Sequence, residues 1–186
     1  MMSVTAAAAA RIRRARLSDV DALARFISAW TTDGTLLPRT RDDLVRHLGD
    51  FRVALDDGVI VGCGALQPVD AALAEIRTVA VEPACRGAGI GGRIVRALMR
   101  DARRAGIERV FCLTRRRSFF ARLGFHEVPR EVFPHKIWND CLACPRLSSC
   151  DEVAMLRRLP HAARKRAVLG GEGPRRPMSL GHVSTA

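Results

Sequence analysis

Residues 75–92 carry the strongest structural signal in this chain and read Glu75-Ile76-Arg77-Thr78-Val79-Ala80-Val81-Glu82-Pro83-Ala84-Cys85-Arg86-Gly87-Ala88-Gly89-Ile90-Gly91-Gly92. The first seven residues alternate, with Ile76, Thr78 and Ala80 on one side and Glu75, Arg77, Val79 and Val81 on the other. A period of two that is rich in β-branched residues predicts a strand. Pro83 cannot donate to a sheet ladder, so we expect the strand to stop before it.

A glycine-rich turn follows this strand and leads into an amphipathic helix. Apolar residues recur at helical spacing behind the turn, at Ile90, Ile94, Val95, Leu98, Met99 and Ala102. The free N–H groups of a helix's first turn favour an anion, and glycines let a phosphate approach the backbone. The ending Gly91-Gly92-Arg93 excludes a Walker A loop, and the frame G-x-G-x-G-G departs from the dinucleotide fingerprint. A nucleotide, a coenzyme A or a purely structural corner remain open at this point.

The flanking sequence predicts the order β-α-α-β-β-β-α-β-α-β-β. Ser18 and Asp21 have the spacing of one helix start, and Thr40 and Asp43 that of a second. A hairpin is expected around Asp56-Asp57-Gly58, with Gly62 and Gly64 marking a bulge or a close backbone approach. The remaining expected elements are strands at 12–14, 51–55, 59–66, 109–113, 125–128 and 153–156 and a short helix at 119–123. The strand at 109–113 follows a helix, which predicts a parallel neighbour for the strand at 75–81.

The net charge of +12 does not describe a nucleic-acid-binding face. Residues 17–156 hold 20 basic and 18 acidic side chains, so most of the excess lies near the two ends. We expect a disordered N-terminus at 1–10, one domain at 11–160 and a disordered basic tail at 161–186. No apolar run is long enough to span a bilayer, and residues 1–10 make a poor signal peptide, which favours a cytoplasmic protein with no membrane partner.

The sequence Arg-Gly-x-Gly-x-Gly after a strand ending Val-Glu-Pro resembles the acyl-CoA loop of the GCN5-related N-acetyltransferase superfamily. The resemblance covers about Ile12 to Leu159 and extends to Phe119-Phe120-Ala121-Arg122-Leu123-Gly124-Phe125. It implies the acyl-CoA N-acyltransferase fold of α/β (α+β) class, a mixed, mostly antiparallel sheet flanked by helices with a central parallel strand pair that splays apart. It also implies acetyl-CoA as co-substrate, held by Val79, Ala80, Val81, Arg86, Gly87, Ala88, Gly89, Ile90, Gly91 and Gly92.

Acetyl transfer to an amine requires a base, because an ammonium group is not nucleophilic. Glu75 is the expected catalytic base, and its alternative role is a structural ion pair with Arg77. The resemblance implies that a backbone N–H of Val79 or Val81 polarises the thioester carbonyl. Family members often use a tyrosine as general acid, but Phe119-Phe120 occupies the matching place and the chain has no tyrosine.

The segments Leu36-Leu37-Pro38-Arg39, Ala74-Glu75-Ile76-Arg77-Thr78, Thr114-Arg115 and 134–141 are similar to stand-alone amino-acid N-acetyltransferases. The resemblance implies acetylation of the α-amine of L-glutamate or L-glutamine, the first step of arginine biosynthesis, with Arg39, Arg77 and Arg115 binding the substrate carboxylates. Two alternatives stay open: an acetyltransferase for another amine or a protein N-terminus, and a non-catalytic acetyl-CoA or arginine sensor. A homodimer is an allowed assembly.

A cysteine-rich insertion at 134–150 has the ligand types of a structural zinc site. Its candidate ligands are His135, Cys141, Cys144 and Cys150. Free thiols or an iron–sulfur centre are the alternatives. The other three cysteines, at 63, 85 and 112, are expected in the core or in loops.

Overall fold

The computed structural model describes residues 10–31, 36–133, 141–142, 144 and 147–160. A seven-stranded sheet forms the centre of the molecule, in the order β1-β2-β3-β4-β5-β7-β6. The strands are β1 (Arg11–Arg14), β2 (Phe51–Asp56), β3 (Val59–Pro68), β4 (Leu73–Val81), β5 (Arg109–Thr114), β6 (His126–Val128) and β7 (Val153–Arg158). The α-helices are α2 (Val20–Ser28), α3 (Arg41–Arg46), α4 (Ile90–Arg104) and α5 (Arg117–Ala121). All ladders are antiparallel except β4–β5, so the predicted mixed, mostly antiparallel sheet is confirmed.

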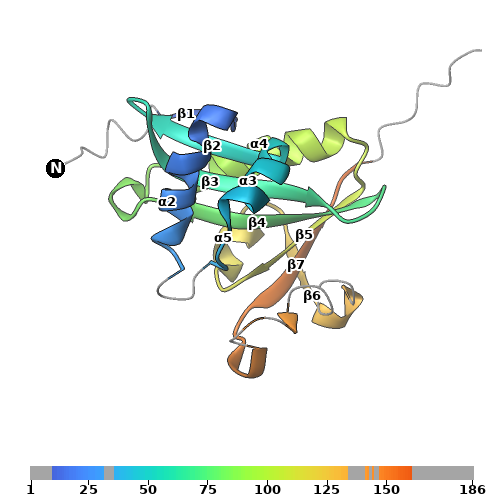
Figure 1. Ribbon diagram of the computed structural model, residues 1–186. Helices are drawn as coiled ribbons and strands as arrows, with labels where there is room; N and C mark the ends of the chain where they lie inside the picture. The colour runs from blue at the N-terminus through green and yellow to red at the C-terminus, as the bar shows by residue number, and fades with distance from the viewer. Residues whose placement is uncertain (1–9, 32–35, 134–140, 143, 145–146, 161–186) are drawn as a thin grey trace, which may run out of the picture.

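Helices cover both faces of the sheet: α2 and α3 pack on one face, and α4 and α5 pack on the other (Figure 1). The larger core cluster lies under α4, where Ile94 and Leu98 are fully buried. The second cluster lies under α2 and α3 and is centred on Leu23, Ile27 and Leu44. The amphipathic spacing of the sequence therefore predicts correctly which helix faces point inward.

The first helix does not begin where the cap pattern predicted. Ser18 lies inside a 3-10 turn at Leu17–Asp19, and α2 starts only at Val20. Asp19 takes the capping role instead, because its carboxylate accepts from the backbone N–H of Arg16 at 2.7 Å and pairs with Arg13. The second predicted cap is confirmed: the hydroxyl of Thr40 accepts from the N–H of Asp43 at 3.1 Å.

Glycines bring helix α4 close to strand β3. A Cβ atom on Gly64 would lie 2.8 Å from Cγ2 of Ile94, and one on Gly62 would lie 3.1 Å from Cδ1 of the same residue. The β3–β4 register also shifts in this region. Both parts of the prediction for Gly62 and Gly64 hold, since the strand has an irregularity and a close approach there.

Strand β4 contains one extra residue at Thr78. Thr78 has a φ of 56°, in the left-handed region that a β-branched residue rarely adopts. The register against β3 passes from the pair Ala65–Arg77 to the pair Cys63–Ala80, so β4 uses three residues where β3 uses two. This is a β-bulge, and it reverses the direction of every side chain that follows.

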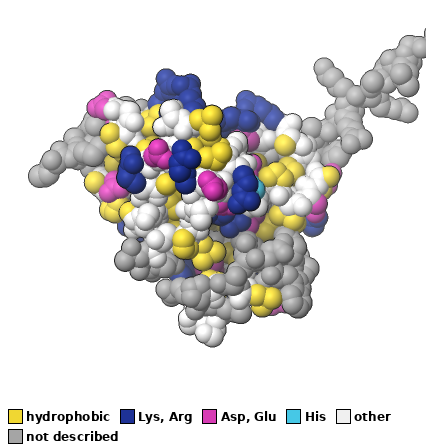
Figure 2. Space-filling view, in the orientation of Figure 1, with side chains coloured by type: hydrophobic (Ala, Val, Ile, Leu, Met, Phe, Trp, Pro, Cys, Tyr) yellow, Lys and Arg dark blue, Asp and Glu magenta, His cyan; other side chains and the backbone are white. Residues whose placement is uncertain are grey.

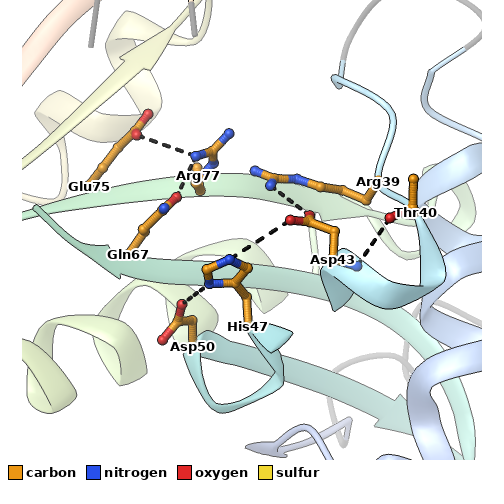
Figure 3. A network of polar contacts seen from close by, with 8 residues as sticks. All are labelled: Arg39, Thr40, Asp43, His47, Asp50, Gln67, Glu75 and Arg77. Carbon is orange, nitrogen blue, oxygen red and sulfur yellow. Dashed lines mark hydrogen bonds and ion pairs between the residues drawn. The ribbon is translucent and has the colours of Figure 1, made fainter. Parts of the chain in front are cut away.

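The predicted alternation of β4 is therefore wrong beyond the bulge. Val79 and Val81 pack on the α4 side, in the cluster that contains Ile76. Ala80 packs on the α2 side, which is also the side of Arg77 (Figure 3). The exchange of faces begins at Thr78, where the pairing with β3 gains one residue that a two-residue period in the sequence does not show.

Strands β4 and β5 are parallel only at their beginning. Their ladder pairs Leu73 with Arg109, Ala74 with Val110 and Glu75 with Phe111, although both strands continue. No further rung joins them in the part of the chain that the structure describes, so the two strands diverge after Glu75. This is the splayed parallel pair that the sequence resemblance implied.

Three expectations concern segments at the limits of the described residues. Ala10, counted with the disordered N-terminus, is buried and its carbonyl accepts from Arg93 at 2.7 Å. The rest of that segment, the basic tail at 161–186 and residues 134–140 of the insertion lie outside the described residues. Among the described residues, no helix combines the length and apolar character needed to cross a bilayer.

Candidate functional site

The glycine-rich turn forms an open loop at the N-terminus of α4. Gly87 and Gly89 have φ values of 86° and 76°, and an added Cβ atom would meet open space at both positions. Gly89 is the N-cap, and the first helical hydrogen bond runs from Arg93 N–H to its carbonyl. Within the described residues, no backbone acceptor takes the N–H groups of residues 87–92. These donors and the positive end of the helix dipole have the chemistry to bind an anion, and the predicted anion site stays a prediction.

Two aromatic rings border this loop. The guanidinium carbon of Arg86 lies 5.2 Å from the ring centroid of Trp30, a cation–π contact that holds the exposed arginine beside the loop. Phe119 of α5 lies on the other side, where a Cβ atom on Gly91 would be 3.3 Å from its Cζ atom. Phe119 therefore places a ring without a hydroxyl at the start of α4, so this side chain cannot serve as a general acid.

Strand β4, which leads to the loop, carries a buried carboxylate on the face opposite to α4. Glu75 is 5% exposed and is the last β4 residue paired with β5. Its Oε2 atom lies 3.9 Å from Nη1 of Arg77, and the same Nη1 donates to Oε1 of Gln67 on β3 (Figure 3). Glu75 and Arg77 are thus brought together, at a distance too long for a direct hydrogen bond between these two atoms.

Arg39 approaches the same space from the segment before α3. Figure 3 shows the guanidinium ends of Arg39 and Arg77 pointing toward one another. Arg39 Nη1 pairs with Oδ2 of Asp43 at 2.9 Å, while its Nε is buried and hydrogen-bonds to none of the described residues. One donor of Arg39 is therefore directed inward without a protein acceptor in that set.

Asp43, the partner of Arg39, itself contacts further polar groups. Asp43 is oriented by the cap bond to Thr40 and by His47, whose Nε2 lies 3.9 Å from Oδ1 of Asp43. His47 Nδ1 lies 3.5 Å from Oδ2 of Asp50. Burial raises the pKa of the Asp50 carboxyl, and the neighbouring His47 opposes that rise.

Arg115 has a different acidic partner from Arg39 and Arg77. It follows the end of β5, and its Nε binds Oδ1 of Asp151 at 2.6 Å. The hydrogen bond that Arg115 donates to Asp151 is the main cause of a raised pKa at Arg115. A substrate carboxylate would have to replace Asp151, which is itself largely exposed, to engage this arginine.

The three cysteines outside the insertion are buried thiols. Burial raises the pKa of Cys63 to about 12 and that of Cys112 well above its ordinary value, the charges of Glu75 and Glu152 adding to the effect at Cys112. Burial also raises the pKa of Cys85, beside the anion loop. A neutral thiol is a poor nucleophile, so Cys112 is not suited to carry an acyl group in this arrangement.

The predicted zinc ligands are not assembled among the described residues. Within the described residues, Cys141, Cys144 and Cys150 belong to no group of three or more metal-binding side chains. His135 lies outside the described residues. The part of the chain that the structure describes therefore holds no assembled set of four zinc ligands.

Sequence reasoning did not identify Gln67 and Asp43 as members of the site. Gln67 faces Glu75 directly in the β3–β4 register, so a correct hairpin register would have found it. Asp43 was noticed only as part of a cap, although its four-residue spacing from Arg39 fits a helical ion pair.

Comparison with known proteins adds independent information. The pattern of the acetyltransferase (GNAT) family matches residues 19–125. An uncharacterized N-acetyltransferase of Chlorobaculum tepidum is 39% identical over 148 residues, covering 80% of this chain and 96% of that protein. The amino-acid acetyltransferase of Mycobacterium tuberculosis is 43% identical over 120 residues, covering 63% of this chain and 68% of that protein.

The fold is also similar to a solved structure of N-acetylglutamate synthase from Neisseria gonorrhoeae complexed with coenzyme A and N-acetyl-glutamate. The TM-score is 0.71 at 30% sequence identity. The match covers 81% of this chain but 35% of the synthase, so this chain spans only part of that protein's length. The expected acyltransferase fold is confirmed by these comparisons.

Proposed function

The chain belongs to the acetyltransferase (GNAT) family, and on that basis we propose that it acetylates the α-amine of an amino acid with acetyl-CoA. L-Glutamate is the first substrate to test and L-glutamine the second. The observation that carries this proposal is a buried carboxylate, Glu75, 3.9 Å from Arg77 at the point where β4 and β5 diverge. The names of the matched amino-acid acetyltransferases support the same substrate class.

The substrate class follows from the chemistry of the two guanidinium groups. An amino-acid substrate always brings an α-carboxylate, and glutamate brings a second one. Arginine binds a carboxylate through two parallel N–H donors, which fixes the orientation as well as the charge. Arg77 and the inward Nε of Arg39 offer such donors on the side of β4 that carries Glu75. Arg115 is the third proposed carboxylate ligand, after release from Asp151.

The proposed reaction begins with proton removal from the substrate ammonium by Glu75, directly or through one water. The free amine then attacks the thioester carbon, the carbonyl oxygen takes up negative charge, and the C–S bond breaks as the amide forms. Backbone N–H groups of β4, at Val79 or Val81, are the proposed donors to that oxygen. The nitrogen gives up its second proton to solvent as the tetrahedral intermediate collapses. The sulfur leaves as a thiolate, which takes its proton from solvent, because Phe119 and Phe120 cannot supply one.

The anion loop has a separate role in this scheme. The pyrophosphate of acetyl-CoA is proposed to bind the N–H groups of residues 87–92, with Arg86 beside it. Residues Val79, Ala80 and Val81 follow on β4 beyond the last rung shared with β5. This arrangement would direct the acyl end of the cofactor along β4 toward Glu75.

The decisive experiment measures thiol release from acetyl-CoA with each of the twenty L-amino acids and with a short unblocked peptide. We expect glutamate or glutamine to give the highest kcat/KM and a mass gain of one acetyl group on the amino acid. Thiol release with the peptide alone would favour the protein N-terminus alternative. A thermal shift with acetyl-CoA but no turnover on any amine would favour a sensor, and either result would overturn the proposal.

A further inference from the structure

Five arginines surround one cavity on the side of the sheet that α4 and α5 cover. The cavity has a volume of about 530 Å³. Its lining comes from α4, from the turn between α5 and β6, and from β7, with no acidic residue among the eight: Arg96, Met99, Arg100, Arg103, Arg122, Leu123, Gly124 and Arg157. A cavity of this size accommodates a ligand as large as a nucleotide.

Three of these arginines lie on one stripe of α4. Arg96, Arg100 and Arg103 are separated by four and three residues, so they are neighbours on the helix surface. Like charges at this spacing destabilise a helix, whereas a glutamate at position 100 would stabilise it. The helix therefore keeps an unfavourable arrangement of charge along the wall of the cavity.

The five arginines have no acidic partner among the described residues. None of them forms an ion pair with a carboxylate in the described part of the chain. Some other arginines, such as Arg13, Arg52 and Arg117, each bind an acidic side chain. The face seen in Figure 2 mixes acidic and basic groups. At the cavity, five unpaired positive charges lie together with no acidic residue in the described lining.

One of the five guanidinium groups is held in place by a hydrogen bond, and a second lies close to the helix backbone. Arg157 donates to the carbonyl of Leu123, and a Cβ atom on Gly124 would lie 3.3 Å from its Cζ atom. The guanidinium of Arg96 folds back toward Gly92, where a Cβ atom would be 3.5 Å from Nη1. A pre-positioned guanidinium loses less side-chain entropy when it binds an anion than a freely moving one.

The cavity is distinct from the anion loop at the start of α4. Arg96 and Arg103 follow Ile90 by six and thirteen residues, which places them roughly 9 and 20 Å along the helix axis. We propose that this cavity binds a second anionic ligand, a small molecule that carries at least two clustered phosphate groups. The guanidinium groups bind the phosphates, and Met99 and Leu123 provide the apolar part of the surface.

The ligand could be a free nucleotide or a bare phosphate chain, and calorimetry separates these sources. The full chain is first saturated with CoA and then titrated with ATP or with tripolyphosphate. We expect one further equivalent of each to bind, with an affinity that falls as salt is added. Equal affinities would identify the phosphate chain as the part of the ligand that is recognised. Tighter binding of ATP would indicate a further contact between its base and the apolar residues Met99 and Leu123.

The double variant Arg100→Gln/Arg103→Gln tests the assignment to this cavity. We expect at least a tenfold loss of affinity for tripolyphosphate. Arg104→Gln is the matched control, because Arg104 lies on the same helix, is exposed and faces Asp101 at 3.6 Å instead of the cavity. We expect its affinity to stay within twofold of the parent chain, and thermal midpoints report whether each variant is folded.

Three results would overturn the proposal. One is the absence of a second equivalent once CoA is bound, which would make the cavity part of the CoA site. Another is equal binding by the folded double variant and the parent chain. The third is displacement of tripolyphosphate by a short single-stranded DNA that binds more tightly than ATP, which would indicate a nucleic-acid surface.

Discussion

Three properties distinguish Glu75 from an ordinary exposed carboxylate. It is buried, it stands at the last rung between two parallel strands, and it shares its surroundings with Arg77 and Gln67. At a separation of 3.9 Å, Oε2 of Glu75 and Nη1 of Arg77 form no short hydrogen bond with each other. A base that accepts a proton from an incoming ammonium needs this kind of environment.

Replacing Glu75 by glutamine should therefore affect the chemical step. For Glu75→Gln we expect kcat with glutamate to fall about 100- to 10,000-fold, while KM for acetyl-CoA stays within about threefold. The loss should become smaller at high pH, where the substrate amine is deprotonated without help. Steady-state kinetics between pH 7 and pH 10 measure both effects.

The matched control for this variant is Glu127→Gln, which changes an exposed carboxylate paired with Arg117. Its kcat should equal that of the parent enzyme. A Glu75→Gln enzyme with parent kcat at pH 7 would show that Glu75 serves only as an ion-pair partner.

Arg39 tests whether guanidinium geometry matters for substrate binding. Arg39→Lys keeps the charge but removes the planar fork and the inward Nε donor. We expect KM for glutamate to rise about 10- to 100-fold, the loss typical of one charged hydrogen bond, with little change in KM for acetyl-CoA. Initial rates at varied glutamate concentration give the result.

Arg41→Lys is the control for Arg39→Lys, since Arg41 follows two residues later and pairs with Asp21 on the surface. Its kinetic constants should not change. An unchanged KM in Arg39→Lys would remove Arg39 from the proposed carboxylate site.

Strand β3 and helix α4 form the element pair on which the anion loop depends. The loop is positioned by the start of α4, and the depth of α4 on the sheet is set by the two glycines of β3. A side chain at Gly64 would have to displace Ile94, which is fully buried. Core packing density leaves little room for such a shift.

Gly64→Ala should lower the free energy of unfolding by about 1–3 kcal/mol, because the new methyl group overlaps Ile94. Ile94→Ala alone should cost about 2–5 kcal/mol through the cavity it leaves. In the double variant the two changes should partly compensate, so that its loss is smaller than the sum of the single losses. Urea unfolding followed by circular dichroism measures all three, and strict additivity would contradict the contact.

At the scale of the whole molecule, Asp101 of α4 interacts with arginines from two strands of the sheet. Its carboxylate binds Arg52 of β2 at 2.5 and 2.7 Å and is approached by Arg14 of β1 and by Arg104. Burial would raise the pKa of Asp101, but the hydrogen bonds and charge of Arg52 and the charge of Arg14 outweigh it and hold the pKa below its ordinary value. One carboxylate thus connects the helix to the edge of the sheet that begins the chain.

This network makes stability depend on pH in a defined direction. A carboxyl whose pKa is lower in the folded state stabilises the fold above its unfolded pKa, and this contribution is lost as pH falls through the folded pKa. We expect Asp101→Asn to lower the free energy of unfolding by about 2 kcal/mol at pH 7. Below about pH 4 its curve should approach that of the parent chain. Denaturant unfolding at a series of pH values gives the curves.

A change in Arg52 provides the control for that measurement. In Arg52→Gln the carboxylate loses its main partner, so Asp101→Asn added to it should cost much less than Asp101→Asn alone. Equal costs in both backgrounds, or a parent stability that does not change between pH 7 and pH 2, would contradict the role of the pair.

Local patterns were enough to predict the order of the elements, the glycine turn, the Thr40 cap and the parallel pairing of β4 with β5. These features depend on residues close in sequence, through backbone propensity, side-chain period and the special conformations of glycine. The roles expected for Glu75, Arg39 and Arg77 rest on their residue types and on the family resemblance, and they stay predictions.

Long-range contacts produced the rest. The bulge at Thr78 turns Val79 and Val81 away from Glu75 because β4 must match β3 and α4 at once. Strand β7 enters between β5 and β6, although it is the last strand of the chain. The pairing of Arg115 with Asp151 and the arginine-lined cavity join residues from separate elements. Side-chain period and local propensity describe each element alone, so they carry no information on which charged groups meet once the sheet is assembled.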